Sequence, residues 1–259
     1  MPIKISVIIV TYNSSYIIGD CLSTLINNLP DGDSEIIVVD NASKDRTINI
    51  VYNYNKNIIL ISLKDNIGFA GGVNRGISVS KGSYVLILNP DVIVNRECID
   101  GLMSFLDRNE NVSAVGPKLT YQDGQTQPSR RRYPHLRAIM THRIAFLKRI
   151  FGEKILSEFL MEDISDKDPV EVEWLIGGCL MLRRDALDDI GLLDSKFFLY
   201  YEDADWCYRA AKKGWKVFYL PQVMAMHLYQ RESTQGINRQ LLWHIMSLFR
   251  FYYKHGFRF

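Results

Sequence analysis

The stretch Ile5-Ser6-Val7-Ile8-Ile9-Val10 is a continuous apolar run of mostly β-branched residues, and the polar triplet Thr11-Tyr12-Asn13 follows it directly. A short run of this composition predicts a strand that is covered on both faces, as strands of parallel sheets are. Similar runs recur at residues 36–39, 58–62, 84–88 and 113–115. The first half of the chain therefore predicts the buried strands of one sheet.

Helix-like stretches separate these runs, at residues 15–29, 45–54, 70–80 and 96–109. Strand alternating with helix predicts an α/β fold with right-handed crossovers and a mostly parallel sheet. Further strands are expected at 170–175, 179–182 and 216–219, and further helices at 138–151, from the acidic cluster to 213, and at 240–254. Ligands of such sheets bind beyond the carboxyl ends of the strands. Here those ends carry Thr11-Tyr12-Asn13, Asp40-Asn41 and Asn89-Pro90-Asp91.

The composition is that of an ordinary globular protein. The 259 residues carry 31 basic and 29 acidic side chains, a net charge of +2. This balance argues against binding nucleic acid through bulk electrostatics. The four cysteines have no paired spacing and are expected to be buried thiols in a reducing compartment. Because no apolar stretch has the length of a signal peptide or a membrane span, we expect a cytoplasmic protein.

An acidic cluster occupies the run Phe198-Leu199-Tyr200-Tyr201-Glu202-Asp203-Ala204-Asp205-Trp206, where aromatic residues flank three carboxylates. Aromatic walls raise the pKa of a carboxyl by desolvation, and neighbouring carboxylates raise it further, so the cluster favours a catalytic base. The alternative is a helix N-terminus, where Glu and Asp suit the macrodipole. The segment alone does not decide between these two interpretations.

Three other patterns carry candidate chemistry. Asp40 ends a buried strand, where its carboxylate could accept the imide N–H of uracil or thymine; capping of the next helix is the alternative. The glycine-rich segment 66–76 opens a helix whose N–H groups could face phosphate. Asp91 and His227 are candidate ligands of Mg²⁺ or Mn²⁺, although a plain turn would also use Asn-Pro-Asp.

Taken together and in order, these motifs resemble family 2 inverting glycosyltransferases, and among them the bacterial rhamnosyltransferase-type branch. The resemblance rests on the following motifs: Thr11-Tyr12-Asn13, Asp40, Asn89-Pro90-Asp91, Gly177-Gly178-Cys179, Glu202-Asp203-Ala204-Asp205 and His227. It implies a GT-A fold over residues 1–232. A Rossmann-like nucleotide half at about 1–118 would merge with a smaller acceptor half at about 119–232, and residues 233–259 would form a C-terminal helical extension.

The resemblance also implies a role for individual residues. Asp203 matches the general base, Thr11 and Asp40 would bind the nucleotide, and Asp91 and His227 would bind the metal. The other expected substrate-binding residues are Asn13, Asn66, Asn74, Asn89, Trp174, Gly177, Gly178, Glu202 and Asp205. The usual Asp-x-Asp reads Asn89-Pro90-Asp91, which lacks one carboxylate and predicts weaker metal binding.

The implied reaction is one in-line displacement at the anomeric carbon with inversion. A dTDP- or UDP-sugar, with rhamnose favoured by the family branch, would be the donor. A saccharide or lipid-linked saccharide of a cell-surface polysaccharide would be the acceptor. The alternatives are a nucleotidyltransferase that makes sugar nucleotides and a sugar-nucleotide-binding module without catalysis.

The C-terminal segment predicts an amphipathic helix with an apolar stripe, formed by Leu241, Ile245, Leu248 and Tyr252. With the basic run Arg130-Arg131-Arg132, this stripe suggests peripheral contact with the inner face of the cell membrane. Packing on the protein's own core and a homodimer contact are the alternatives.

Overall fold

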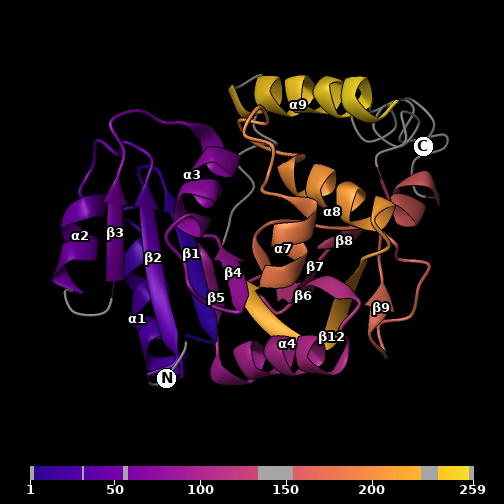
Figure 1. The fold of residues 1–259 in the computed structure, drawn as a ribbon, viewed down its shortest axis with the longest axis horizontal. Coiled ribbons are helices and arrows are strands. Elements are labelled where there is room, and N and C mark those ends of the chain that lie inside the picture. Colours follow the sequence, from indigo (N-terminus) through magenta and orange to yellow (C-terminus); the bar gives the residue numbers. More distant parts are fainter. Residues whose placement is uncertain (1–2, 31, 55–57, 134–153, 229–238, 257–259) are drawn as a thin grey trace.

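The computed structural model describes residues 3–30, 32–54, 58–133, 154–228 and 239–256. Its main sheet has the strand order β3-β2-β1-β4-β11-β6-β12-β5, with β7 beside β6 and β9 beside β12 (Figure 1). These strands are β1 (Ile5–Thr11), β2 (Ser34–Asp40), β3 (Ile58–Ser62), β4 (Tyr84–Leu88), β5 (Val92–Val94), β6 (Val112–Thr120), β7 (Thr126–Gln127), β9 (Val170–Glu171), β11 (Cys179–Arg183) and β12 (Lys216–His227). A separate small sheet pairs β8 (Arg130–Arg131) with β10 (Trp174–Leu175).

The sheet changes from parallel to mixed at β4. Strands β3, β2, β1 and β4 run parallel to one another, as the apolar runs predicted. Strand β11 is antiparallel to both β4 and β6, whereas β12 returns parallel to β6. The predicted α/β class with a mostly parallel nucleotide-type half is therefore confirmed.

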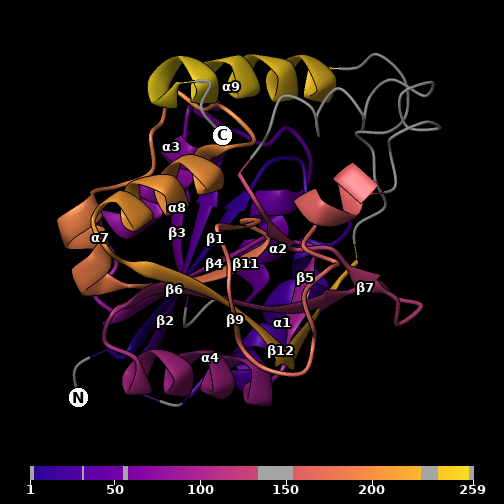
Figure 2. The same cartoon turned by 90° about the vertical axis from the view of Figure 1, so that its right-hand side faces the viewer.

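Helices cover both faces of the sheet because alternate side chains of β1 enter two different clusters. Ile5, Val7 and Ile9 pack with helices α1 (Ile18–Asn28), α2 (Thr47–Asn53) and α4 (Arg96–Arg108). Ile8 and Val10 join the cluster under α3 (Gly68–Ile77), α7 (Arg184–Ile190), α8 (Glu202–Lys212) and α9 (Arg239–His255). Figures 1 and 2 show α4 and α9 on opposite sides of the molecule.

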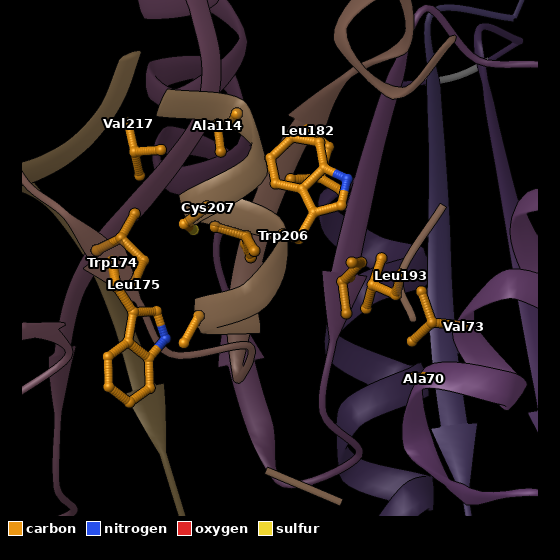
Figure 3. Packing of buried hydrophobic residues seen from close by; sticks show 14 of the residues in the cluster. Ala70, Val73, Ala114, Trp174, Leu175, Leu182, Leu193, Trp206, Cys207 and Val217 are labelled. Atoms are coloured by element: carbon orange, nitrogen blue, oxygen red, sulfur yellow. The ribbon is translucent and has the colours of Figure 1, made fainter. Parts of the chain in front are cut away.

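The second cluster surrounds the helix that carries the acidic motif. Trp206 and Cys207 of α8 are almost fully buried, and they pack with Trp174 of β10 and Leu182 of β11 (Figure 3). Full burial of a large aromatic side chain stabilises a fold by roughly 1.5–3 kcal/mol. The acidic motif is thus built on a helix that is fixed to the sheet by its own aromatic residue.

Several predicted elements differ from the structure at their ends. The strand expected at 170–175 is two short strands in different sheets, because the chain leaves β12 after Glu171 and pairs with β8 from Trp174. The strand expected at 216–219 continues to His227, and an irregularity between Leu220 and Met224 accommodates the proline. Strand β5 and helix α7 were not predicted, and the helix expected at 138–151 lies outside the described residues.

The predicted C-terminal helix is present as α9, but the predicted apolar stripe is divided between two faces of the helix. Leu248 and Tyr252 are 7% and 3% exposed and pack in the core cluster, in agreement with the alternative of packing on the protein's own core, whereas Ile245 is exposed. The outward apolar face instead consists of Leu242, Ile245, Met246, Phe249 and Tyr253, which we call the outer face of α9. In the part of the chain that the structure describes, no helix combines the length and apolar character needed to span a bilayer.

Gly68 supports a testable expectation about stability. It has φ of +80°, and a Cβ there would lie 2.5 Å from the carbonyl oxygen of Phe198, next to the Phe69 N–H that this oxygen accepts at 2.8 Å. Gly214 has a similar φ of +84° but open space around it. We expect Gly214→Ala to cost about 1–2 kcal/mol, and Gly68→Ala to cost clearly more in denaturant unfolding. Equal losses would mean that the Phe198 loop shifts without resistance.

Candidate active site

The carboxyl ends of β1 and β2 bring Thr11 and Asp40 together, since these residues are direct partners in the parallel register. The Thr11 hydroxyl donates to Asp40 Oδ1 at 3.1 Å, and the Ser43 N–H donates to Oδ2 at 2.9 Å. Asp40 has no exposed surface. Its visible role is therefore to hold the turn after β2, while Asp45 binds the N–H of Thr47 at the start of α2. Contact of Asp40 with a nucleobase stays a prediction.

The three asparagines expected at the nucleotide hold the backbone of loops. Asn13 Oδ1 accepts from the Lys44 N–H at 2.8 Å, and Asn66 Oδ1 accepts from the Gly68 N–H at 2.9 Å. Asn74 makes a reciprocal pair with the backbone of Leu193, at 2.7 and 3.1 Å. All three side chains thus have a visible structural role, and their direct contact with substrate stays a prediction.

Asp91 and His227 come together although they are far apart in the sequence, since Asp91 lies in the turn between β4 and β5 and His227 is the last residue of β12. Their Oδ1 and Nε2 atoms lie 3.2 Å apart, and both side chains are nearly buried. The other ring nitrogen of His227, Nδ1, lies 2.7 Å from Gln127 Oε1. A glutamine oxygen can only accept, so the His227 ring donates from Nδ1 in this contact. In the neutral form of such a ring, Nε2 is the nitrogen with the lone pair, and it is Nε2 that faces the carboxylate.

A carboxylate oxygen and an imidazole nitrogen that face each other with their lone pairs would both be stabilised by a hard or borderline cation placed between them. Imidazole nitrogen and carboxylate oxygen suit Mg²⁺ or Mn²⁺, and the hydrogen bond at Nδ1 is the usual support of a metal-binding histidine. Among the described residues no group of three such side chains is close enough to hold an ion alone. Any metal here would take its remaining ligands from substrate and water.

The acidic motif begins helix α8, so the helix-terminus alternative is correct for its position, and a catalytic role is compatible with it. Asp203 is 8% exposed, and its two oxygens accept from the backbone N–H groups of Ala204 and Gly177, each at 2.8 Å. Burial raises the pKa of Asp203 above its ordinary value, against the opposing effect of these hydrogen bonds and of the positive charge of Arg131. A buried carboxyl with a raised pKa is suited to proton transfer.

Gly177 and Gly178 join the two halves of the site. Gly177 donates to Asp203, whereas a Cβ on Gly178 would lie 3.7 Å from His227 Cε1 and 3.8 Å from Asn89 Nδ2. Asn89 in turn donates its N–H to the Gly178 carbonyl at 2.9 Å. One dipeptide without side chains therefore separates the candidate base from the candidate metal pair. A small apolar cavity beside it is lined by Phe69, Leu193, Asp203 and Trp206, among others.

Glu202 and Asp205 do not face this cavity as substrate-binding residues would. Asp205 has no exposed surface, and its oxygens lie 2.9 Å from Arg209, 2.6 Å from Lys254 and 2.8 Å from His255. Burial disfavours its charge, yet these partners hold the pKa of Asp205 below its ordinary value. For Glu202, burial and the nearby Asp203 raise the pKa well above the usual range. Ion pairs thus enclose the oxygens of Asp205, and the expected substrate contacts of Asp205 and Glu202 stay predictions.

Comparison with known families identifies the chain. The sequence model described as Glycosyl transferase family 2 matches residues 6–191. The protein belongs to glycosyltransferase family 2. It is accordingly an enzyme that transfers a sugar from a nucleotide sugar, and the predicted resemblance is confirmed. The nucleotidyltransferase and non-catalytic alternatives lose their support.

Curated relatives of this family 2 glycosyltransferase include rhamnosyltransferases. The N-acetylglucosaminyl-diphospho-decaprenol L-rhamnosyltransferase of Mycobacterium tuberculosis is 29% identical over 210 residues, which is 77% of this chain and 67% of the relative. The dTDP-rhamnosyl transferase RfbF of Shigella flexneri is 27% identical over 92% of this chain and 74% of its own length. The low-salt glycan biosynthesis hexosyltransferase Agl10 of Haloferax volcanii is 27% identical, with 89% and 69% covered.

Solved structures confirm the GT-A fold. The mannosyltransferase PcManGT of Pyrobaculum calidifontis, solved with GDP-Man and Mn²⁺, superposes with a TM-score of 0.66 at 17% identity over 99% of this chain and 67% of that one. GalNAc-T7, solved with UDP, GalNAc and Mn²⁺, gives a TM-score of 0.68 at 16% identity, covering 95% of this chain and about half (48%) of the other.

Two residues that contact members of the candidate site, Gln127 and Arg131, were not predicted from the sequence. Gln127 supports His227 from the two-residue strand β7, and no motif pointed to it. Arg131 was grouped with a basic membrane-facing run, but its guanidinium lies over the rings of Trp174 and Phe159, at 5.5 and 5.4 Å. Its strand pairing with Trp174 places it there. Trp174 itself is only 6% exposed, so its predicted place in the sugar pocket stays a prediction.

The other two arginines of that basic run are held by the protein. Arg130 is 8% exposed, pairs with Asp166 at 3.0 Å and lies over the Tyr219 ring. Arg132 pairs with Asp163 at 2.8 Å. The charges of both residues are thus compensated locally, and contact of the run with lipid headgroups stays a prediction.

Proposed function

We propose that this family 2 glycosyltransferase is an inverting rhamnosyltransferase that uses dTDP-rhamnose and a lipid-linked saccharide acceptor in cell-surface polysaccharide synthesis. The single observation that carries the catalytic part is the Gly177-Gly178 dipeptide, with Asp203 against one residue and the Asp91–His227 pair against the other. The rhamnose and lipid parts rest on similarity to the rhamnosyltransferases of M. tuberculosis and S. flexneri.

In the proposed mechanism Asp203 removes the proton of the acceptor hydroxyl while the oxygen attacks the anomeric carbon. The raised pKa of Asp203 brings its basicity closer to that needed at neutral pH. The Gly177 N–H fixes the orientation of the carboxylate, so that one oxygen lone pair is aimed before the acceptor arrives. Attack from the side of Asp203 and departure toward Asp91 place the two groups on opposite faces of the sugar, which inverts the configuration.

We further propose that Asp91 and His227 hold a Mg²⁺ or Mn²⁺ ion, with Gln127 fixing the histidine tautomer. When bound, the ion would neutralise the charge that develops on the nucleoside diphosphate. The side-chain amide of Asn89 lies beside Gly178, as His227 does, and it would donate to the diphosphate. Thr11, Asn13 and Asp40 would shape the nucleotide end of the site.

Asp203→Asn tests the proposed function. We expect it to lower the turnover of dTDP-rhamnose by ~10²–10⁴, the scale of a missing general base, with dTDP binding within a few-fold. Because the pKa of Asp203 is raised, the parent's activity should rise with pH through a value above that of an ordinary aspartate. Nucleotide release with dTDP-rhamnose, UDP-glucose and GDP-mannose, with acceptor present, measures both donor choice and turnover. Near-parental transfer by the variant would exclude Asp203 as the base.

Metal removal tests the Asp91–His227 pair. We expect EDTA to abolish transfer, Mg²⁺ or Mn²⁺ to restore it, and Asp91→Ala and His227→Ala each to raise the metal concentration needed. Asp123→Ala, in the exposed turn before β7, is the matched control and should behave like the parent. Calorimetric titration of Mn²⁺ in the presence of dTDP should show the weaker metal binding of both variants directly, without a catalytic assay. Full activity in excess EDTA would show that the protein's own groups suffice at the diphosphate.

Contact with a membrane surface is the third expectation, because a lipid-linked acceptor must be reached from the bilayer. The outer face of α9 exposes Leu242 (55%), Met246 (59%), Phe249 (66%) and Tyr253 (91%). Arg250 and Lys254, which are nearby, pair with Asp194. Each of them therefore contributes less to the binding free energy than the ~1 kcal/mol of an unpaired basic side chain near anionic lipid.

We expect weak co-sedimentation with phosphatidylglycerol vesicles that survives moderate salt and is lost in Phe249→Glu. Transfer to a short-chain, detergent-soluble acceptor should be unchanged in this variant. Absence of binding at low salt would leave the outer face to another partner and would favour a soluble acceptor.

A further inference from the structure

The chain enters helix α8 through a strained turn. Tyr200 and Tyr201 are consecutive left-handed residues with φ of 69° and 66°, and Glu202 and Asp203 follow directly. A non-glycine residue in this region costs of order 1–3 kcal/mol and persists only when its surroundings hold it. Something outside α8 must therefore stabilise this turn, and with it the position of Asp203.

Helix α9 contacts this turn along its length. Ser247 donates from its hydroxyl to the Leu199 carbonyl at 2.8 Å, and Ser247 is only 4% exposed. The Trp243 ring stacks on Phe198 with centroids 4.3 Å apart. The His244 ring lies 5.3 Å from Tyr200 and 5.0 Å from Tyr201. Figure 1 shows α9 lying across this end of α8.

A second set of contacts fixes α8 just after Asp203. Lys254 Nζ lies 2.6 Å from Asp205 Oδ1 and 2.9 Å from Asp194 Oδ2, so it links the helix to the loop before it. His255 Nε2 approaches the same Asp205 oxygen at 2.8 Å. Removing a partner from a buried carboxylate is costly, because the charge left behind has no water to solvate it.

We propose that α9 is a positioning element for catalysis, in which Ser247 and Lys254 hold the chain on both sides of Asp203 and keep its carboxylate against the Gly177 N–H. The proposal rests on the proposed role of Asp203 as the base. The two sets of contacts flank Asp203 at Leu199 and Asp205, so a shift of α9 moves the first turn of α8. On the opposite side, the Gly177 N–H bond at 2.8 Å would break with a shift of about an ångström.

The residues that carry this role lie beyond position 191, where the match to the family's sequence model ends. The role of α9 therefore rests on its contacts in this structure. Ser247 and Lys254 touch neither the cavity beside Asp203 nor the Asp91–His227 pair, so they are positioning residues and not catalytic ones.

Lys254→Met, Lys254→Arg and Ser247→Ala, each in the full chain, test the proposal. A misplacement of about 1 Å can cost on the order of 10²-fold, so we expect Lys254→Met to lower kcat for dTDP-rhamnose by ~10–10²-fold. KM for the donor and calorimetric binding of dTDP should stay within a few-fold. Lys254→Arg should recover most of kcat, and Ser247→Ala should lower kcat in the same selective way.

Lys213→Met is the matched control, since it deletes a lysine near the other end of α8 whose partner Asp189 is exposed. It should keep the parent's kcat. If Lys254→Met is folded and keeps the parent's kcat, or if kcat and dTDP binding fall together, the positioning role of α9 is excluded. Should Lys254→Met fail to fold, Ser247→Ala decides by the same two measurements.

The result is separable from the test of the base itself. Loss of transfer in Asp203→Asn together with full kcat in Lys254→Met and Ser247→Ala would overturn only the role of α9. Parental transfer in Asp203→Asn would overturn the base, whatever the α9 variants do.

Discussion

The cost of burying three carboxylates at the start of one helix constrains the whole site. Glu202, Asp203 and Asp205 are each less than a tenth exposed, and an unpaired buried charge costs several kcal/mol. Each carboxylate meets this cost differently. Asp205 is charged and enclosed by cations, Asp203 is held by two backbone N–H groups, and the pKa of Glu202 rises, which favours its neutral form. The cations around Asp205 include Lys254 of α9, one of the N–H groups at Asp203 comes from Gly177, and Glu202 is surrounded by the core.

The sheet explains why such a helix end meets a candidate metal pair. Strand β4 is parallel to β1 but antiparallel to β11, so the chain that enters β11 passes the carboxyl end of β4. That passing segment is Gly177-Gly178. Side chains there would fill the space between Asp203 and His227, since a Cβ on either glycine would already touch one of them. The reversal of strand direction therefore creates the place where both halves of the site meet.

Much of the fold and part of the site follow from sequence patterns alone. Continuous apolar runs predicted β1, β2 and β4 closely, because buried parallel strands need apolar side chains on both faces. The run at 58–62 also forms a strand, but β3 lies at the edge of the sheet and is only partly buried. The order of short motifs pointed to family 2 and to Asp203, Asp91 and His227. In the structure Asp203 and His227 lie against one dipeptide, and Asp91 lies beside His227. These motifs could be recognised because each lies at or next to the end of a helix or strand. There a short run of polar residues follows or precedes an apolar run, and this change is visible in the sequence.

Tertiary structure alone decided what each polar side chain contacts. Asn74 and Asp205 look like ligand-binding residues in sequence, yet one binds the backbone of Leu193 and the other binds cations from α9, partners 119 and about 50 residues away. Gln127 had no local signal at all, and the apolar pattern of α9 did not show which of its residues face inward. Periodicity shows that a helix has two faces, but which face is buried depends on the surface it meets, and that surface is assembled from distant parts of the chain.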